Sequence, residues 1–87
     1  MCTQENIERI QRDIDSMLAI ANELDPKEDK AVINYIVSDI ELSLSLLDDQ
    51  NLRNELDKES FIKLENYVDN ITIDIWELTA KTLDVGP

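Results

Sequence analysis

The most regular hydrophobic pattern in the chain runs from Phe61 to Thr82. Its members are separated alternately by three and four positions: Phe61, Leu64, Val68, Ile71, Ile75, Leu78 and Thr82. This spacing places them on one face of an α-helix, and a helix of this kind buries its apolar face against neighbours. We therefore predict a helix that begins at Asp57 or Glu59 and ends near Leu83, before the stop signal Gly86-Pro87.

The first half of the chain contains two further patterns with the same spacing. The first consists of Ile7, Ile10, Ile14, Met17, Ala21 and Leu24, and the second of Ile33, Val37, Ile40, Leu44 and Leu47. The first pattern predicts a helix that is capped by Thr3 and ends near Leu24. The second predicts a helix over Pro26–Asp49, which Asp25 would cap with Glu28 as its capping-box partner.

The stretch between the second and third predicted helices allows two interpretations. Asp48–Asn51 is typical of a helix end or a turn, after which Leu52 and Leu56 would form one short helical turn against the core. Alternatively, the second helix continues through Leu56 and turns at Asp57. We favour the break. With short connections, neighbouring helices run antiparallel, so the sequence predicts an all-α fold with a single domain, residues 1–87. The expected architecture is a small antiparallel up-down-up three-helix bundle, with or without a short extra helical turn between its second and third helices.

The second and third predicted helices carry a second set of apolar residues outside the buried pattern. On the second helix this set is Val32, Tyr35, Leu42 and Leu46, with Asp39 among them, and on the third it is Ile62, Tyr67, Ile73 and Trp76. On the first helix, the only large apolar residues beside the buried pattern are Leu18 and Ile20. A bundle of 87 residues has too little interior to bury two faces of each helix. The extra faces must therefore be covered by the Leu52–Leu56 connector, by a second copy of the chain or by a foreign partner.

The charge of the chain is strongly negative. It has 20 acidic and 8 basic residues, a formal net charge of −12, which repels nucleic acid and anionic membranes and favours basic partners. The acidic residues Asp39, Glu41, Asp69 and Glu77 lie in stretches without Lys or Arg, on the helices that have two apolar faces. Apolar residues ringed by carboxylates are typical of a surface that binds a basic protein. The candidate partner-binding residues are Tyr35, Asp39, Leu42, Leu46, Asp69, Ile73, Trp76 and Glu77.

The sequence offers little material for catalysis or metal binding. It has no His, and the single Cys2 can form neither a disulfide framework nor a zinc site. A glycine-rich phosphate loop is excluded, because Gly86 is the only glycine in the sequence. Asp48–Glu55 has the oxygen density of a calcium loop but lacks the glycine and the spacing. We expect no enzymatic activity, no metal and no cofactor. Without an apolar run of about 20 residues to span a membrane, and with no disulfides, a cytoplasmic location is expected.

These observations favour a small acidic protein that binds another protein. The leading hypothesis is an inhibitor of the immunity or antitoxin type, which neutralises a basic protein such as a nuclease toxin by covering its positively charged surface. A phage-encoded inhibitor of a nucleic-acid-binding system would have the same sequence properties. The alternative is a self-associating structural or adaptor protein, in which two copies bury the second faces in a homodimer. No direct contact with nucleic acid or with a membrane is expected.

Overall fold

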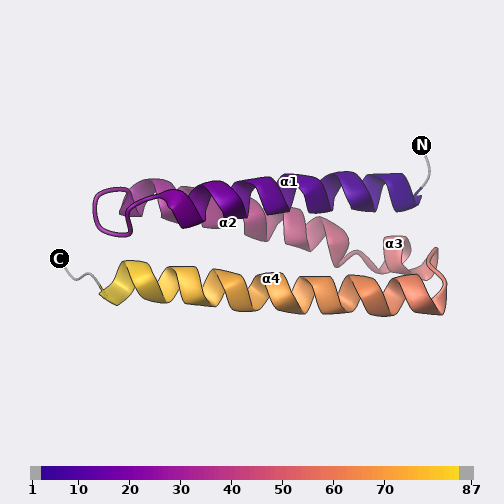
Figure 1. Ribbon diagram of the computed structural model, residues 1–87. Helices are drawn as coiled ribbons and strands as arrows, with labels where there is room; N and C mark the ends of the chain where they lie inside the picture. The colour runs from indigo at the N-terminus through magenta and orange to yellow at the C-terminus, as the bar shows by residue number, and fades with distance from the viewer. Residues whose placement is uncertain (1–2, 85–87) are drawn as a thin grey trace.

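The computed structural model describes residues 3–84, and this part of the chain consists of helices joined by short turns. The helices are α1 (Thr3–Glu23), α2 (Lys30–Leu47), α3 (Gln50–Asn54) and α4 (Lys58–Asp84). Figure 1 shows the three long helices lying lengthwise, with α1 and α4 running in one direction and α2 in the other. Helix α2 packs against both α1 and α4. The all-α prediction is confirmed for this part, and the predicted stop signal Gly86-Pro87 lies outside it.

The core is formed by the three predicted hydrophobic patterns. The buried residues are Ile7, Ile14 and Ala21 on α1, Ile33, Val37, Ile40 and Leu47 on α2, and Leu64, Ile71, Ile75, Leu78 and Thr82 on α4. Thr82 is the one polar residue among them in the described part, and its hydroxyl donates to the Thr79 carbonyl at 2.8 Å. This hydrogen bond satisfies the hydroxyl, so the threonine occupies a core position without an unpaired polar atom.

The start of α2 differs from the prediction. Asp25 acts as a cap, because its Oδ1 accepts hydrogen bonds from the backbone N–H groups of Lys27 at 2.8 Å and Glu28 at 3.2 Å. These two bonds hold the pKa of the Asp25 carboxyl below its usual value. However, Pro26–Asp29 forms a turn, and α2 begins only at Lys30. The predicted start at Pro26 was wrong, because Asp29 has non-helical backbone angles of φ −105° and ψ 20° and separates the capped turn from the helix.

The capping-box partner of Asp25 was also predicted wrongly. The Asp25 backbone N–H donates to Asp29 Oδ2 at 3.1 Å, so the reciprocal bond comes from Asp29 and not from Glu28. At the other end of the hairpin, Thr3 does not cap α1. It is the first residue of that helix, and its hydroxyl donates to Glu55 Oε2 beyond α3. This contact ties the start of α1 to the connection between α3 and α4.

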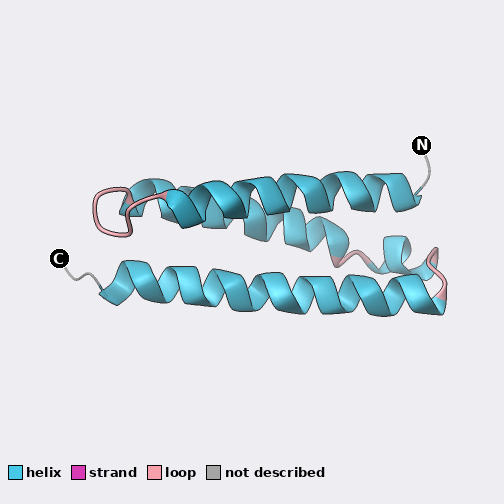
Figure 2. Cartoon of the chain, in the orientation of Figure 1, coloured by secondary structure: helices cyan, strands magenta, loops and turns pink. Residues whose placement is uncertain are grey.

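The break after α2 is confirmed. Helix α2 ends at Leu47, and Asp49 caps α3 by accepting hydrogen bonds from the backbone N–H groups of Asn51 at 2.8 Å and Leu52 at 3.4 Å. Figure 2 shows α3 as a single short turn between the long helices α2 and α4. Leu52 and Leu56 are half-buried and pack against the core, so the connector closes one end of the molecule.

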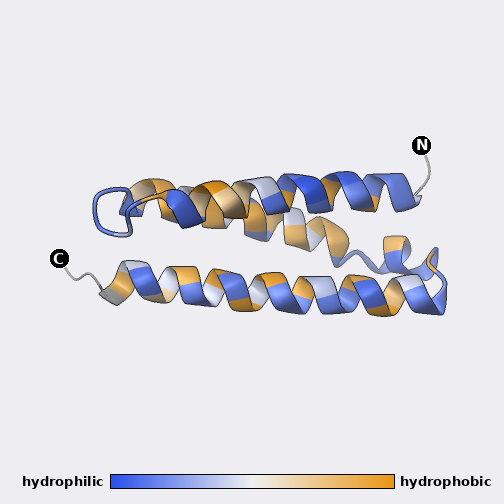
Figure 3. Ribbon diagram, viewed as in Figure 1, coloured by the Kyte–Doolittle hydropathy of each residue, from blue (hydrophilic) through white to orange (hydrophobic). Residues whose placement is uncertain are grey.

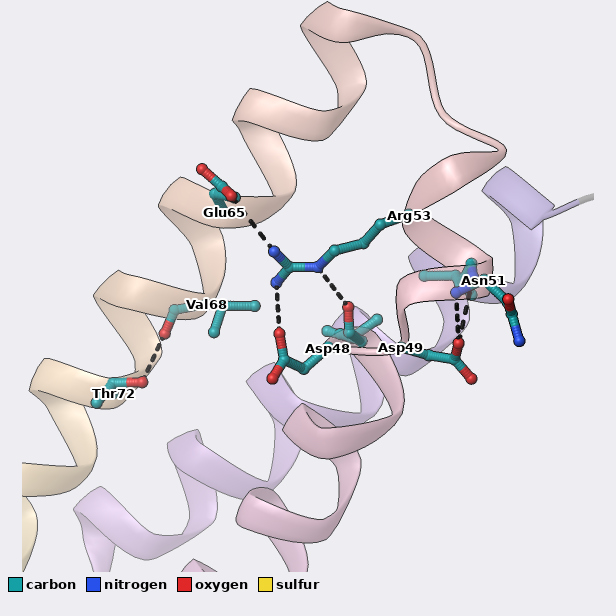
Figure 4. A network of polar contacts seen from close by, with 9 residues as sticks. Asp48, Asp49, Asn51, Arg53, Glu65, Val68 and Thr72 are labelled. Atoms are coloured by element: carbon teal, nitrogen blue, oxygen red, sulfur yellow. Dashed lines mark hydrogen bonds and ion pairs between the residues drawn. The ribbon is translucent and has the colours of Figure 1, made fainter.

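Arg53 joins the three elements at this corner (Figure 4). Its Nε donates to the Leu47 carbonyl at 3.2 Å, and its guanidinium pairs with Asp48 at 3.2 Å and Glu65 at 3.4 Å. The guanidinium also lies 5.5 Å from the ring centroid of Phe61. Asp48 would otherwise place a negative charge at the negative end of α2, so Arg53 supplies the positive charge that this helix terminus needs.

Replacing Arg53 with Ala should lower the free energy of unfolding by about 2–3 kcal/mol, since the change removes a charge-assisted hydrogen bond and a cation–π contact together. Only 12% of its side chain is exposed, so water replaces these contacts poorly. Denaturant titration measures the change. Lys63→Ala is the control, because its pair with Glu59 is exposed on both sides and should contribute less than about 1 kcal/mol. Equal losses in the two variants would contradict a special role for Arg53.

Helix α4 begins at Lys58, within one residue of both predicted starts, Asp57 and Glu59, and Tyr67 connects it to α1. Asp57 Oδ1 accepts the backbone N–H of Ser60 at 2.7 Å, which lowers the pKa of the Asp57 carboxyl. The Tyr67 hydroxyl lies 2.8 Å from Asp15 Oδ1 and 3.0 Å from the Gln11 carbonyl. Tyr67 was predicted to belong to the second apolar set of its helix. It is instead half-buried and packed against the core, and its hydroxyl is hydrogen-bonded to α1.

Tyr67 makes the stability depend on alkaline pH. Burial, and then the hydrogen bond to the Asp15 carboxylate, raise the pKa of the Tyr67 phenol above its usual value near 10. A raised pKa in the folded state gives stability that is complete below the unfolded pKa and is lost as the pH rises above it. We expect the melting temperature to fall more steeply above about pH 10 in the native chain than in Tyr67→Phe. Parallel pH profiles for the two proteins would refute this link.

Candidate protein-binding surfaces

Nine large apolar side chains are exposed in the described part of the chain. They are Ile20, Val32, Tyr35, Leu42, Leu46, Ile62, Ile73, Trp76 and Leu83. Apart from Tyr67, all members of the two predicted second sets are among them. The connector around α3 therefore leaves these faces uncovered. Figure 3 shows hydrophobic and hydrophilic residues interleaved along α4, whereas the connection between α1 and α2 is hydrophilic.

The exposed apolar residues of α4 form a stripe along its outer face, as their spacing shows. Ile73 follows Ile62 by eleven positions, and Trp76 follows Ile73 by three. At 100° per residue these positions lie within about 60° of one another and nearly opposite Ile71, which is buried in the core. Helix α4 thus has an apolar face on each of two opposite sides, and among the described residues 3–84 only one of these faces packs against the other helices.

One edge of this stripe forms a groove with α2, here called the α2–α4 groove. It has a volume of ≈ 550 Å³ and is lined by Glu41 and Leu44 of α2 and by Thr72, Ile75, Trp76, Thr79, Ala80 and Leu83 of α4. Ile75 is buried and forms the floor, whereas 69% of Trp76 is exposed at the groove. The Thr72 hydroxyl donates to the Val68 carbonyl at 2.8 Å (Figure 4), which satisfies its polar atom within the helix.

The exposed residues of α2 face a different side of the molecule. Asp39, Leu42 and Ser43 of α2 and Asp13, Ser16 and Met17 of α1 line a hollow of ≈ 520 Å³, here called the α1–α2 hollow. Tyr35 precedes Leu42 by two helical turns, and Leu46 follows it by one. Both therefore lie on the same side of α2 as Leu42 and form an exposed stripe with it. The α1–α2 hollow and the α2–α4 groove lie on opposite flanks of α2.

The predicted partner-binding residues are therefore not brought together into one surface. Asp39 and Leu42 line the α1–α2 hollow, whereas Trp76 lines the α2–α4 groove. The outer faces of neighbouring helices point in different directions when their inner faces share one core, which separates the two sets. The sequence placed Ile20 outside the buried pattern of its helix, but neither Ile20 nor Leu83 was among the candidate binding residues, and both are exposed. Leu83 follows Trp76 by seven positions, so the spacing of the stripe on α4 could have indicated it.

Most carboxylates beside these surfaces lack a cation. Among the side chains of residues 3–83, the ion pairs join Arg53 to Asp48 and Glu65, and Lys63 to Glu59. Asp39 and Glu41, which line the two surfaces, take part in none of them, and neither do Asp69 and Glu77 on α4. The negative charge at both surfaces is therefore not neutralised by the described part of the chain.

Comparisons with protein-family models, with curated proteins and with solved structures find no match. Within residues 3–84, the structure brings no three His, Cys, Asp or Glu side chains together in a position to hold a metal ion, and none of the helices there is both long and apolar enough to cross a bilayer.

Proposed function

We propose that this chain is a small acidic inhibitor of the immunity or antitoxin type, as used by bacteria, which neutralises a basic protein such as a nuclease toxin. In this proposal α1, α2 and α4 act as one antiparallel three-helix bundle in the cytoplasm, without catalytic activity. The observation that carries it is the exposure of Trp76 in an apolar groove whose neighbouring carboxylates have no ion-pair partner in the described part of the chain.

The α2–α4 groove has the features of an interface centre. Tryptophan often contributes most of the binding energy when it is buried in a partner's pocket and surrounded by contacts that exclude water. Ile75 and Leu44 provide an apolar floor, and Leu83 extends the apolar area along α4. Burying Trp76 and Leu83 would remove two large apolar side chains from water, which favours association.

The net charge of −12 supports a basic partner. A nuclease presents positive charge to the phosphates of its substrate, and an acidic protein of this size could cover that surface. Opposite charges also accelerate the encounter of two proteins, and salt weakens this effect. A phage-encoded inhibitor of a nucleic-acid-binding protein would work in the same way, with a different target.

Coexpression with the product of an adjacent gene would test this function. If that product is a toxic nuclease, cells should survive only when the chain is also present, and the purified nuclease should be inhibited at one inhibitor per enzyme. A neighbouring product that is acidic, or whose activity is unchanged by a tenfold excess of the chain, would contradict the proposal.

Charge reversal should slow the association. In the variant Asp69→Lys with Glu77→Lys, we expect the association rate constant to fall about tenfold at low salt, and its dependence on salt to flatten. Stopped-flow mixing at several NaCl concentrations measures both quantities. An association rate of the native chain that is independent of salt would rule out electrostatic steering.

A self-associating adaptor is the second candidate, favoured by apolar residues that are exposed on two sides of the molecule. Two copies could cover these faces in a homodimer, although each copy carries a charge of −12. Sedimentation equilibrium distinguishes the candidates. A monomer at micromolar concentration favours the inhibitor, and a tight dimer in which Trp76 is protected from quenching favours the adaptor.

A further inference from the structure

Helix α2 carries two hydrophobic repeats with the same spacing. The inner repeat faces α1 and α4, and all its members are buried except Leu44, which is half-buried. The outer repeat consists of Val32, Tyr35, Asp39, Leu42 and Leu46, which are separated by three, four, three and four positions. Its four apolar members are all exposed. Alternation of three and four is the spacing with which one helix packs against another, so the outer face of α2 has the pattern of a helix-packing surface without a helix on it.

Helix α1 widens this surface. Met17 lines the α1–α2 hollow and is half-buried, and Ile20 follows it by three positions and is exposed. Because α1 and α2 are antiparallel, Ile20 lies toward the same end of the pair as Tyr35. The outer repeat of α2 and the adjoining α1–α2 hollow are together called the furrow, and the repeat is about 21 Å long from Val32 to Leu46 at 1.5 Å per residue.

Asp39 marks the centre of the furrow with a negative charge. It is half-buried, lies between Tyr35 and Leu42 in the outer repeat, and takes part in no ion pair among the side chains of residues 3–83. Asp13 lines the same hollow, and α2 has no Lys or Arg after Lys30. A binding partner that covers this face would remove the Asp39 carboxylate from water. This desolvation costs free energy unless the partner supplies a cation that pairs with the carboxylate.

The furrow could be covered by a second copy of the chain, by nucleic acid or by a helix of another protein, and its charge favours the last of these. A second copy that met this stripe about its centre would place Asp39 opposite Asp39, between two chains of charge −12 each. Nucleic acid is repelled by the same charge. A helix with apolar residues at the matching spacing and one basic residue in the middle satisfies both the apolar furrow and the carboxylates.

We propose that the α1–α2 face is a second binding site, separate from the α2–α4 groove, which takes an amphipathic helix of a partner protein with a central Lys or Arg paired to Asp39. The chain then binds proteins on both flanks of α2. This site does not depend on the inhibitor function, because it uses other residues and would remain if the α2–α4 groove bound nothing.

Two labelled peptides of about 18 residues provide the test, since this length covers the furrow. Both are amphipathic helices with Leu at the apolar positions, and they differ only in a central Lys or Glu. Fluorescence anisotropy should show that the Lys peptide binds the native chain at least tenfold more tightly than the Glu peptide. With Asp39→Lys this preference should reverse.

A matched control separates a site from general attraction to an acidic protein. Glu41→Lys makes the same change of charge on the same helix, but Glu41 lines the α2–α4 groove. It should leave the ratio between the two peptides within about twofold of the native value. Leu42→Ala should weaken the Lys peptide about tenfold, whereas Trp76→Ala should not weaken it.

Several outcomes would overturn the proposal. These are a preference that Asp39→Lys leaves unchanged, an equal effect of Glu41→Lys, or an equal loss in Trp76→Ala and Leu42→Ala. A native dimer that must dissociate before the peptide binds would show that a second copy covers this face. Should Asp39→Lys fail to fold, Asp39→Asn replaces it, and that variant should abolish the preference for Lys over Glu.

Discussion

Trp76→Ala should weaken binding to the basic partner at least thirtyfold, a loss of about 2 kcal/mol or more in binding free energy. The reason is that Trp76 is the largest side chain at the α2–α4 groove and has 69% of its surface free to be buried by a partner. The same exposure means that the free chain loses little, so its free energy of unfolding should change by less than about 1 kcal/mol. Calorimetric titration and denaturant titration measure the two quantities.

Tyr35→Ala is the matched control for this prediction. Tyr35 is also aromatic and also 69% exposed, but it belongs to the outer stripe of α2 on the other flank. Arg12→Ala on α1 provides a second control, because Arg12 belongs to neither surface. If Tyr35→Ala or Arg12→Ala weakens the binding of the inhibited partner as much as Trp76→Ala does, the α2–α4 groove is not the inhibitory site.

The second large effect concerns stability. Ile40→Ala should lower the free energy of unfolding by about 2–5 kcal/mol, because the Ile40 side chain is fully buried and its removal leaves a cavity in the core. Leu42→Ala, two residues along the same helix, should lower it by less than about 1 kcal/mol, because 67% of that side chain is exposed. Urea titration followed by circular dichroism measures both values.

This pair of variants tests the two-sided character of α2 directly. Both replacements remove a large aliphatic side chain and leave alanine, which favours helix formation, so helix propensity does not explain a difference. Losses of similar size would mean that Leu42 is covered, as in a tight dimer that buries the outer face. A change in the apparent stability of Leu42→Ala with protein concentration would identify that dimer, since association stabilises by mass action.

The positions of the helices followed from local properties of the sequence. The spacing of three and four along α1, α2 and α4 depends on the pitch of the α-helix alone, so it could be read without any knowledge of neighbours. The cap at Asp57 was likewise local, since its carboxylate binds a backbone N–H group only three residues away. The exposed second faces were also correctly indicated, because one small core cannot cover two sides of a helix.

The errors had two sources, which are competition between local signals and a contact between distant parts of the chain. Asp25 and Pro26 are a strong helix start, but Asp29 was an equally good partner for Asp25 and ended the capped turn before α2 began. Tyr67 was assigned to an outer face by its distance from the buried repeat. Its length allows the hydroxyl to reach Asp15 on α1, a contact that no spacing within α4 can reveal.

The sequence by itself determined roughly where the three long helices lie, which side of each one is buried, and the excess of acidic over basic residues in the chain. These properties depend on helical periodicity and composition, which belong to short segments and to the chain as a whole. Only the tertiary structure decided that the exposed residues of α2 and α4 form two surfaces. The direction of an outer face depends on how helices are placed around their shared core, and α2, packed against both neighbours, separates Leu42 from Trp76.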